Sequence, residues 1–217
     1  MINVARYLLA GQTRSRGVIA PLAVLVGGVI VLYAQPPNPV LSTAGTVAAF
    51  LFPVQCWLTL AFYNAQGAVD RQLLAATVGG RRLAGGRLLA AGVLAAASSL
   101  LALLVPLIGG AFERSPRLDE IALILGANLS ATLAGAALAM PFSAPIVRNA
   151  ALSTLGLATC VVLTIALRIP PMIPIARALD TTRAGHAAGP LAREAAILLA
   201  ATLVITAVGV PLWRWRE

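Results

Sequence analysis

Residues 88–112 read LLAAGVLAAASSLLALLVPLIGGAF, and no charged side chain occurs between Arg87 and Glu113. A helix rises about 1.5 Å per residue, so about 20 apolar residues cross the roughly 30 Å hydrocarbon core of a bilayer. The complete chain has 217 residues, of which 59% are hydrophobic and 11% are charged, whereas about 25% of the residues in a soluble domain are charged. Apolar blocks in a chain of this composition predict an integral membrane protein.

Similar apolar blocks lie on both sides of this stretch. Together they predict six transmembrane helices, at about 18–34, 40–63, 88–112, 121–140, 150–167 and 195–212. Helices are expected because lipid offers no partner to unpaired backbone groups, and the blocks lack the alternation of a membrane barrel. We therefore predict an all-α integral membrane fold in which residues 1–217 form a single transmembrane domain.

The basic residues set the predicted orientation. All 16 of them are arginines, and they are scattered between the apolar blocks instead of forming one basic face, which argues against nucleic acid as a partner. With the amino terminus inside, the inner segments hold more arginines than the outer segments, in line with the positive-inside rule. Arginine in place of every lysine, with abundant Ala and Gly, is typical of a GC-rich bacterial genome. We predict a multi-pass protein of a bacterial cytoplasmic membrane with both termini in the cytoplasm.

Residues 1–16 precede the first block and have an amphipathic pattern. Val4 and Leu8 fall on one half of a helical wheel, while Arg6 and Arg14 fall on the other. A helix with this pattern is expected to lie in the membrane interface with its arginines toward the lipid headgroups. The alternative is a positively charged flank that only fixes the topology.

The segment VDRQLLAATVGGRRLAGGRLL, residues 69–89, separates the second and third blocks and is charged. Asp70 is a suitable N-cap and the pair Gly79 and Gly80 can end a helix, so a helix is expected at about 70–80. This helix is too short to cross a bilayer. The predicted topology places it on the cytoplasmic side.

One face of this short helix is predicted to be largely apolar. It consists of Leu73, Leu74, Thr77 and Val78. Such a face is either covered by a partner or dips back into the membrane interface, and the sequence leaves both alternatives open. Arginines then follow that should hold the beginning of the third span at the inner headgroups. They are Arg81, Arg82 and Arg87.

Residues 169–180, between the fifth and sixth blocks, are apolar but interrupted. Pro170, Pro171 and Pro174 stop a helix because each lacks an N–H and restrains the residue before it. The apolar residues that follow are too few to cross the membrane again. A re-entrant or interfacial segment on the outer side is therefore predicted, with an exposed loop as the alternative.

This layout resembles the permease subunits of ABC-2 type transporters. The shared features are an amphipathic amino-terminal helix, six spans, a cytoplasmic helix between the second and third spans and a broken apolar segment between the fifth and sixth. The local match runs from the acidic Asp70 through the apolar helix and a break to the basic pair Arg81 and Arg82. The family often has proline in the break, where this chain has Val78 and Gly79.

The resemblance implies a coupling helix at about 70–80 that docks into a separate ABC ATPase subunit. The residues that it assigns to this contact are Asp70, Arg71, Leu73, Leu74, Thr77, Val78, Arg81 and Arg82. It also implies a second copy of this chain, or a similar permease, within surrounding membrane lipids. ATP and Mg²⁺ would be bound by the ATPase, and no cofactor by this chain.

The sequence lacks the signatures of catalysis. A GxxxxGK[ST] phosphate loop is impossible because the chain has no lysine. His186 is the only histidine, and Cys56 and Cys160 lie in apolar blocks without CxxC spacing, so neither a metal site nor a histidine-based active site is expected. Paired carboxylates within the spans are also absent, which argues against a proton-coupled carrier. We expect a transport subunit that is not itself an enzyme.

A few polar residues fall inside the predicted spans. Those that could line a substrate path are Gln55, Thr59, Asn128, Ser130 and Thr132. Hydrogen bonds between helices are the simpler explanation of these residues. If they do line a path, its mostly apolar surroundings favour a hydrophobic or amphipathic substrate.

The leading hypothesis is therefore the membrane-spanning permease subunit of an ATP-driven ABC-2 type exporter. An alternative within transport is the substrate-binding membrane subunit of a vitamin-type (energy-coupling factor) importer, which also has six spans. Outside transport, the alternatives are an intramembrane enzyme and a structural or regulatory membrane protein.

Overall fold

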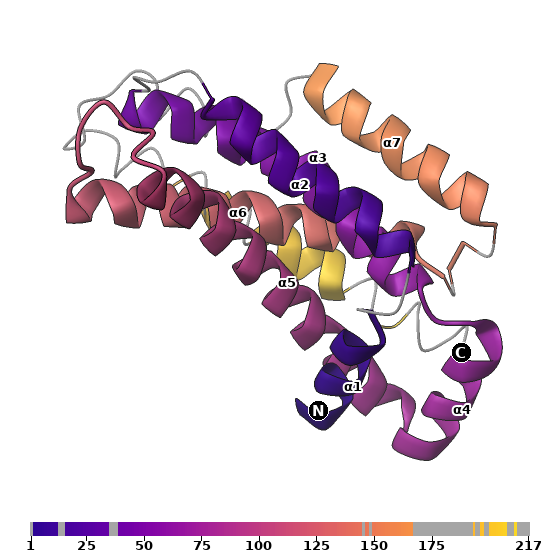
Figure 1. The fold of residues 1–217 in the computed structure, drawn as a ribbon. Coiled ribbons are helices and arrows are strands. Elements are labelled where there is room, and N and C mark those ends of the chain that lie inside the picture. The colour runs from indigo at the N-terminus through magenta and orange to yellow at the C-terminus, as the bar shows by residue number, and fades with distance from the viewer. Residues whose placement is uncertain are drawn as a thin grey trace.

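The computed structural model describes residues 2–12, 16–34, 39–144, 146–147 and 149–166, and then 193, 196–197, 200–207 and 211. No strand occurs among these residues, which confirms the predicted all-α fold. The helices up to residue 166 are α1 Ile2–Gln12, η1 Arg16–Val18, α2 Ile19–Leu32, α3 Val40–Asn64, α4 Ala68–Val78, α5 Gly80–Ile108, α6 Leu118–Ala139, η2 Met140–Phe142 and α7 Ala150–Ala166 (Figure 1).

Among the residues that the structure describes, three helical segments are long and apolar enough to cross a membrane. They are Val40–Asn64, Gly80–Ile108 and Leu118–Phe142. They coincide with the second, third and fourth predicted spans and confirm the membrane character of the chain.

The other predicted spans are shorter in the structure or only partly described. The first and fifth fall on the apolar helices α2 and α7. The 14 residues of α2 extend only about 21 Å at 1.5 Å per residue. The sixth, at 195–212, is described mainly at 200–207, which is helical. The predicted re-entrant segment at 169–180 lies outside the described residues, and a total of six spans stays a prediction.

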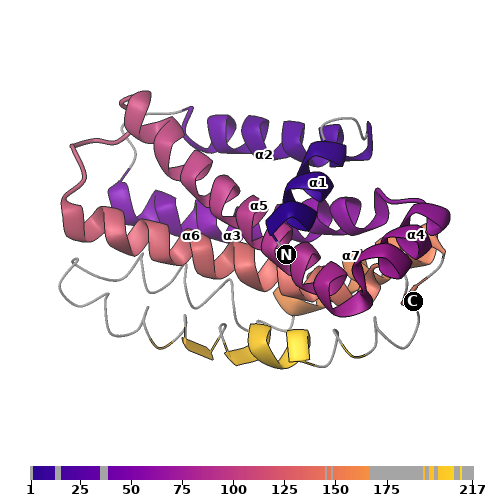
Figure 2. The ribbon, with the colours of Figure 1, turned by 90° about the horizontal axis from the view of Figure 1, so that it is seen from below.

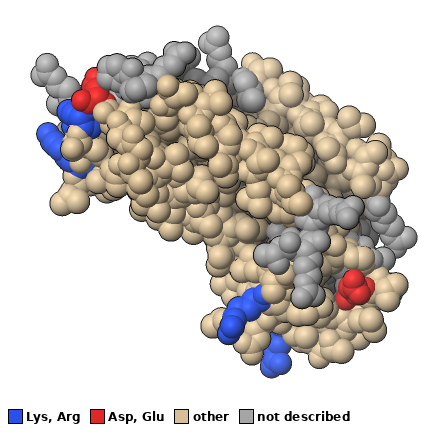
Figure 3. All heavy atoms as spheres, viewed as in Figure 1, with Lys and Arg blue, Asp and Glu red and all other residues tan. Residues whose placement is uncertain are grey.

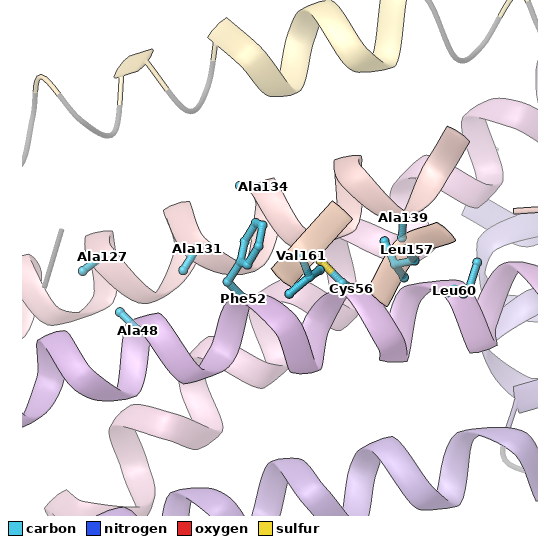
Figure 4. Close-up of a cluster of buried hydrophobic side chains, with 10 residues drawn as sticks. All are labelled: Ala48, Phe52, Cys56, Leu60, Ala127, Ala131, Ala134, Ala139, Leu157 and Val161. Atoms are coloured by element: carbon cyan, nitrogen blue, oxygen red, sulfur yellow. The ribbon is translucent and has the colours of Figure 1, made fainter. Parts of the chain in front are cut away.

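Helix α3 is the centre of the bundle, in contact with α2, α5, α6 and α7. Helices α3 and α6 run in the same direction, so that Ala48 lies near Ala127 and Leu60 lies near Ala139 (Figure 4). The other members of this buried cluster are Phe52, Cys56, Ala131, Ala134, Leu157 and Val161. The alanines let the two helix backbones approach closely, which is how membrane helices gain packing contacts.

The charged side chains lie at the ends of the molecule, as is typical of a membrane protein. On the face shown in Figure 3, charged side chains gather at two ends of the molecule, and the described surface between them is uncharged. One end holds the connection between α5 and α6, with Arg114 and Arg117. The other end holds α1, α4 and the beginning of α5, which both ribbon views place together (Figures 1 and 2).

Helix α1 confirms a helix at the amino terminus, but protein covers part of its apolar face. Ala5 and Leu8 are buried in a cluster with Phe62 and Tyr63 at the end of α3. Val4 packs against Gly86 of α5, where an added Cβ would lie 2.6 Å from the Val4 Cγ1 atom. Part of the apolar face is therefore used for docking onto α3 and α5, and the position of α1 in the membrane interface stays a prediction.

Candidate functional site

Helix α4 begins earlier than predicted. Its N-cap is Gly67 and its first residue is Ala68, so Asp70 lies within the first turn and makes no side-chain cap. The expectation that Asp70 caps the helix was wrong. Its carboxylate is still favourably placed, because the positive end of the helix dipole lies at the first turn.

A single glycine separates α4 from α5. Gly79 has φ +84° and ψ 139°, a backbone conformation that side-chain-bearing residues rarely adopt. Its N–H donates to the Ala75 carbonyl at 3.0 Å and so completes the end of α4. Gly80 is already the first residue of α5. The predicted break is confirmed at Gly79 but not at Gly80, and the helix that contains most of the third predicted span begins well before residue 88.

The predicted apolar face of α4 is divided between two environments. Leu73 is 59% exposed and Thr77 is exposed, whereas Leu74 and Val78 are partly buried. The Thr77 hydroxyl donates to the Leu73 and Leu74 carbonyls, with oxygen-to-oxygen distances of 2.9 and 3.2 Å. Val69 lies one turn before Leu73 and is 68% exposed. We call Val69, Leu73 and Thr77 the outer face of α4.

The basic residues predicted at this end behave differently from one another. Arg81 and Arg82 are exposed in the first turn of α5. The side chain of Arg71 lies outside the described residues. Arg87 is only 2% exposed and therefore does not lie at the surface as Arg81 and Arg82 do, and a contact of Arg87 with headgroups stays a prediction.

A cavity of about 490 Å³ lies between α1, the end of α3, α4 and α5. Its lining residues are Tyr7, Leu8, Ala10, Gly11, Phe62, Tyr63, Ala65, Gln66, Asp70, Leu74 and Arg87. Arg87 donates from Nη2 to the Gln66 Oε1 atom at 3.2 Å. The cavity thus holds a buried guanidinium and, from α4, a carboxylate. The sequence interpretation did not find this cavity.

Helical spacing carried a signal for the inward position of Arg87. The residues three and four positions before and after Arg87 are all buried. They are Leu83, Ala84, Ala90 and Ala91. Residues at these spacings share one helix face. Arg87 therefore lies on the buried face of α5, which a comparison of its neighbours would have shown.

The residues proposed to line a substrate path are all buried. Two of them, Gln55 and Thr59, bond to each other along α3, with Nε2 donating to Oγ1 at 3.2 Å. Ser130 bonds within α6, to the Gly126 carbonyl. Thr132 makes the predicted interhelical bond, because its hydroxyl lies 2.9 Å from that of Ser99 on α5.

Asn128 is unusual among these residues. It is 1% exposed, and neither its amide nitrogen nor its side-chain oxygen has a hydrogen-bond partner. The Gln55 Oε1 atom is also buried without a hydrogen-bond partner. A buried polar group without a partner costs about 1–3 kcal/mol. Within the described part of the chain, the unpaired polar atoms of these two amides therefore lower the stability of the packed helices.

The end of the bundle opposite to the cavity is held by ion pairs. Arg114 donates to both carboxylate oxygens of Glu120, one of them at 2.8 Å. The backbone N–H of Arg117 donates to the same carboxylate at 2.9 Å. The hydrogen bond to Glu120 raises the pKa of the Arg114 guanidinium above its ordinary value. These contacts fix the beginning of α6 to the connection that precedes it.

No group of three or more His, Cys, Asp or Glu side chains that could hold a metal ion occurs among the described residues. Among the described residues, the α1–α4–α5 end combines the buried Arg87, the Asp70 carboxylate, the exposed Arg81 and Arg82 and the outer face of α4. Comparison of the chain with protein-family models, with curated proteins and with solved structures finds no match.

Proposed function

We propose that this chain is the membrane-spanning permease subunit of an ATP-driven transporter of the ABC-2 type. It exports a hydrophobic or amphipathic substrate, and a separate subunit binds and hydrolyses ATP. The observation that carries the proposal is the outer face of α4, an exposed apolar stripe on a short helix at one end of the spans. The resemblance of the whole layout to ABC-2 permeases supports the same function.

The outer face of α4 has the properties of a docking surface for a soluble partner. Val69 and Leu73 are 68% and 59% exposed, and both lie beyond the end of α3, the preceding span. Exposed apolar side chains that cluster on a helix mark a site of contact with a protein or a membrane, and we propose a protein contact here. Arg81 and Arg82 are exposed just after this helix and supply a polar rim of the kind that surrounds interface cores.

The joint between α4 and α5 suits the transmission of motion. One residue, Gly79, separates the two helices, so a displacement of α4 is passed directly to α5. Helix α5 has 29 residues, about 44 Å at 1.5 Å per residue, and it therefore extends through the full bilayer. Movement of a bound ATPase would tilt α5 against α3 and α6.

The test is purification of the tagged chain from its own membranes, followed by measurement of ATP hydrolysis in the purified complex. Leu73→Asp places a charge in the outer face of α4 and should remove the ATPase. Leu118→Asp is the matched control, because Leu118 is 86% exposed at the opposite end of the bundle and should leave the complex intact. A wild-type protein that purifies without ATPase activity, or retention of the ATPase by Leu73→Asp, would contradict the proposal.

A further inference from the structure

We propose that the cavity between α1, α3, α4 and α5 binds the headgroup of a zwitterionic aminophospholipid. Arg87 receives the phosphate and Asp70 receives the primary ammonium group. This site goes beyond the proposed transport function and does not depend on it, since a membrane protein of any function can hold a structural lipid.

The position of the cavity along the helices matches the headgroup layer. It is lined by Phe62, Tyr63, Ala65 and Gln66, which bracket the end of α3 at Asn64. Helix α5 is about 14 Å longer than the roughly 30 Å hydrocarbon core. Its charged residues, Arg81, Arg82 and Arg87, all lie near its beginning, so we assign the excess length to this end. The cavity is therefore at the level where the phosphates of one leaflet are found.

Arg87 has the chemistry of a phosphate site. A guanidinium presents planar, paired N–H donors that match two oxygens of a phosphate, and it stays charged at any physiological pH. Arg87 lines the cavity but is only 2% exposed, so the phosphate would meet the small part of this side chain that faces the cavity, where the attraction for an anion is stronger than in bulk water. The hydrogen bond to Gln66 orients the side chain, since Nη2 donates to the amide oxygen at 3.2 Å.

Asp70 supplies the opposite charge to the same cavity. It lines the wall formed by α4, while Arg87 lines the wall formed by α5. A ligand that carries both a phosphate and an ammonium group is complementary to this pair of walls. A primary ammonium offers three N–H donors to a carboxylate, whereas a choline headgroup offers none. An anionic headgroup without an amine would place its net negative charge beside Asp70.

The remaining lining suits the part of a phospholipid next to the phosphate. Leu8 of α1, Phe62 of α3 and Leu74 of α4 contribute apolar surface, and the Tyr7 side chain adds a phenol. The volume of about 490 Å³ falls within the range of about 300–1,000 Å³ that is usual for small-molecule sites. Gly11, on α1, has open space where a Cβ would be.

The test is lipid binding to the purified full chain, read by native mass spectrometry and by the lipid-induced rise in Tm. The probes are phosphatidylethanolamine, phosphatidylcholine and phosphatidylglycerol. Phosphatidylethanolamine should bind the wild type most tightly. Arg87→Gln should weaken it about tenfold or more, because the bond removed is charge-assisted. Asp70→Asn should abolish the preference for phosphatidylethanolamine over phosphatidylcholine. Equal binding of all three lipids to the wild type, or unchanged binding by Arg87→Gln, would overturn the site.

A second pair of variants covers the case in which Arg87→Gln does not fold. Gly11→Phe fills the cavity from α1 without altering the charged side chains, and it should reduce lipid binding about tenfold. Gly27→Phe is the matched control on α2, where the glycine is exposed and also has open space at its Cβ. Binding that is unaffected by Gly11→Phe excludes this cavity. Glycerophosphoethanolamine distinguishes a lipid from a soluble phosphate compound, and binding of this compound as tight as that of the lipid would overturn the lipid assignment.

Discussion

Gly135 of α6 lies directly against the backbone of Phe52 on α3, so that a Cβ at position 135 would approach the Phe52 carbonyl oxygen to 2.7 Å. The Cys56 nitrogen would be 3.2 Å away. Backbone atoms within a helix cannot move aside as a flexible side chain can. Gly135→Ala should therefore force α3 and α6 apart and destabilise the protein by about 1–3 kcal/mol.

The measurement is thermal unfolding of the purified protein in detergent, where this loss corresponds to a fall in Tm of about 2 °C or more. Gly126→Ala is the matched control on the same helix, because nothing lies within 4 Å of its would-be Cβ. It should be neutral or slightly stabilising, since alanine favours helix over glycine. Equal Tm values for the two variants would mean that the α3–α6 contact is looser than described.

The docking of α1 depends on a second glycine contact, between Gly86 and Val4. Gly86→Leu should displace α1, because a Cβ alone would lie 2.6 Å from Val4 Cγ1. A helix that is no longer docked unfolds more easily, so limited trypsin digestion after Arg6, which is exposed, should remove the amino terminus faster than in the wild type. Gly92→Leu, on the same helix with open space at its Cβ, should digest at the wild-type rate. Identical digestion of both variants would rule out this docking contact.

The sequence predicted the helices well because their signal is local. A run of apolar residues without charge specifies a helix in lipid irrespective of its neighbours, and the second, third and fourth predicted spans each coincide with a helix. The break at Gly79 was also predictable, since glycine is the residue that tolerates a positive φ. The beginning of α5 is harder to predict, because Arg81, Arg82 and Arg87 are typical of a charged flank, although arginine is also a good helix former.

The cavity could not be predicted from local signals. It forms where segments far apart in sequence meet, with Tyr7 and Gly11 on α1, Gln66 after α3 and Arg87 on α5. The same is true of the contacts of Asn64, whose side-chain oxygen accepts a hydrogen bond from the N–H of Ala144 at 2.9 Å. Nothing in the composition of either segment marks the other as its partner. Only the folded arrangement brings Arg87 to a cavity that it shares with α1 and α4.

The buried amide of Asn128 leads to a prediction about stability. Asn128→Leu replaces two polar atoms that have no hydrogen-bond partner with an apolar side chain of similar size. It should stabilise the protein by about 1–3 kcal/mol, because the desolvation cost of the amide disappears. The result is read from Tm in detergent. A fall in Tm would show instead that the amide is satisfied by a bound water or a ligand.

The contact between Ser99 and Thr132 is suited to a double-mutant cycle. Their hydroxyl oxygens are 2.9 Å apart across the α5–α6 interface, and Thr132 also bonds to the Asn128 carbonyl of its own helix. Ser99→Ala, Thr132→Val and the double variant should give a coupling of about 0.6 kcal/mol, the average for hydrogen bonds between membrane helices. A coupling that is indistinguishable from zero would mean that the hydroxyls bond only to their own helices.

The conformation of Gly79 allows the joint between α4 and α5 to be tested without altering either helix. Gly79→Ala places a Cβ on a residue with φ +84° and ψ 139°, which should cost about 1–3 kcal/mol in strain. Gly80→Ala is the matched control, because Gly80 is the first residue of α5 and alanine should be neutral or favourable there. If α4 transmits ATPase motion to α5, the strained joint in Gly79→Ala should also reduce transport per ATP hydrolysed, whereas Gly80→Ala should leave that ratio unchanged. A ratio that is unchanged in Gly79→Ala despite a lowered Tm would show that the angle between these helices does not control transport.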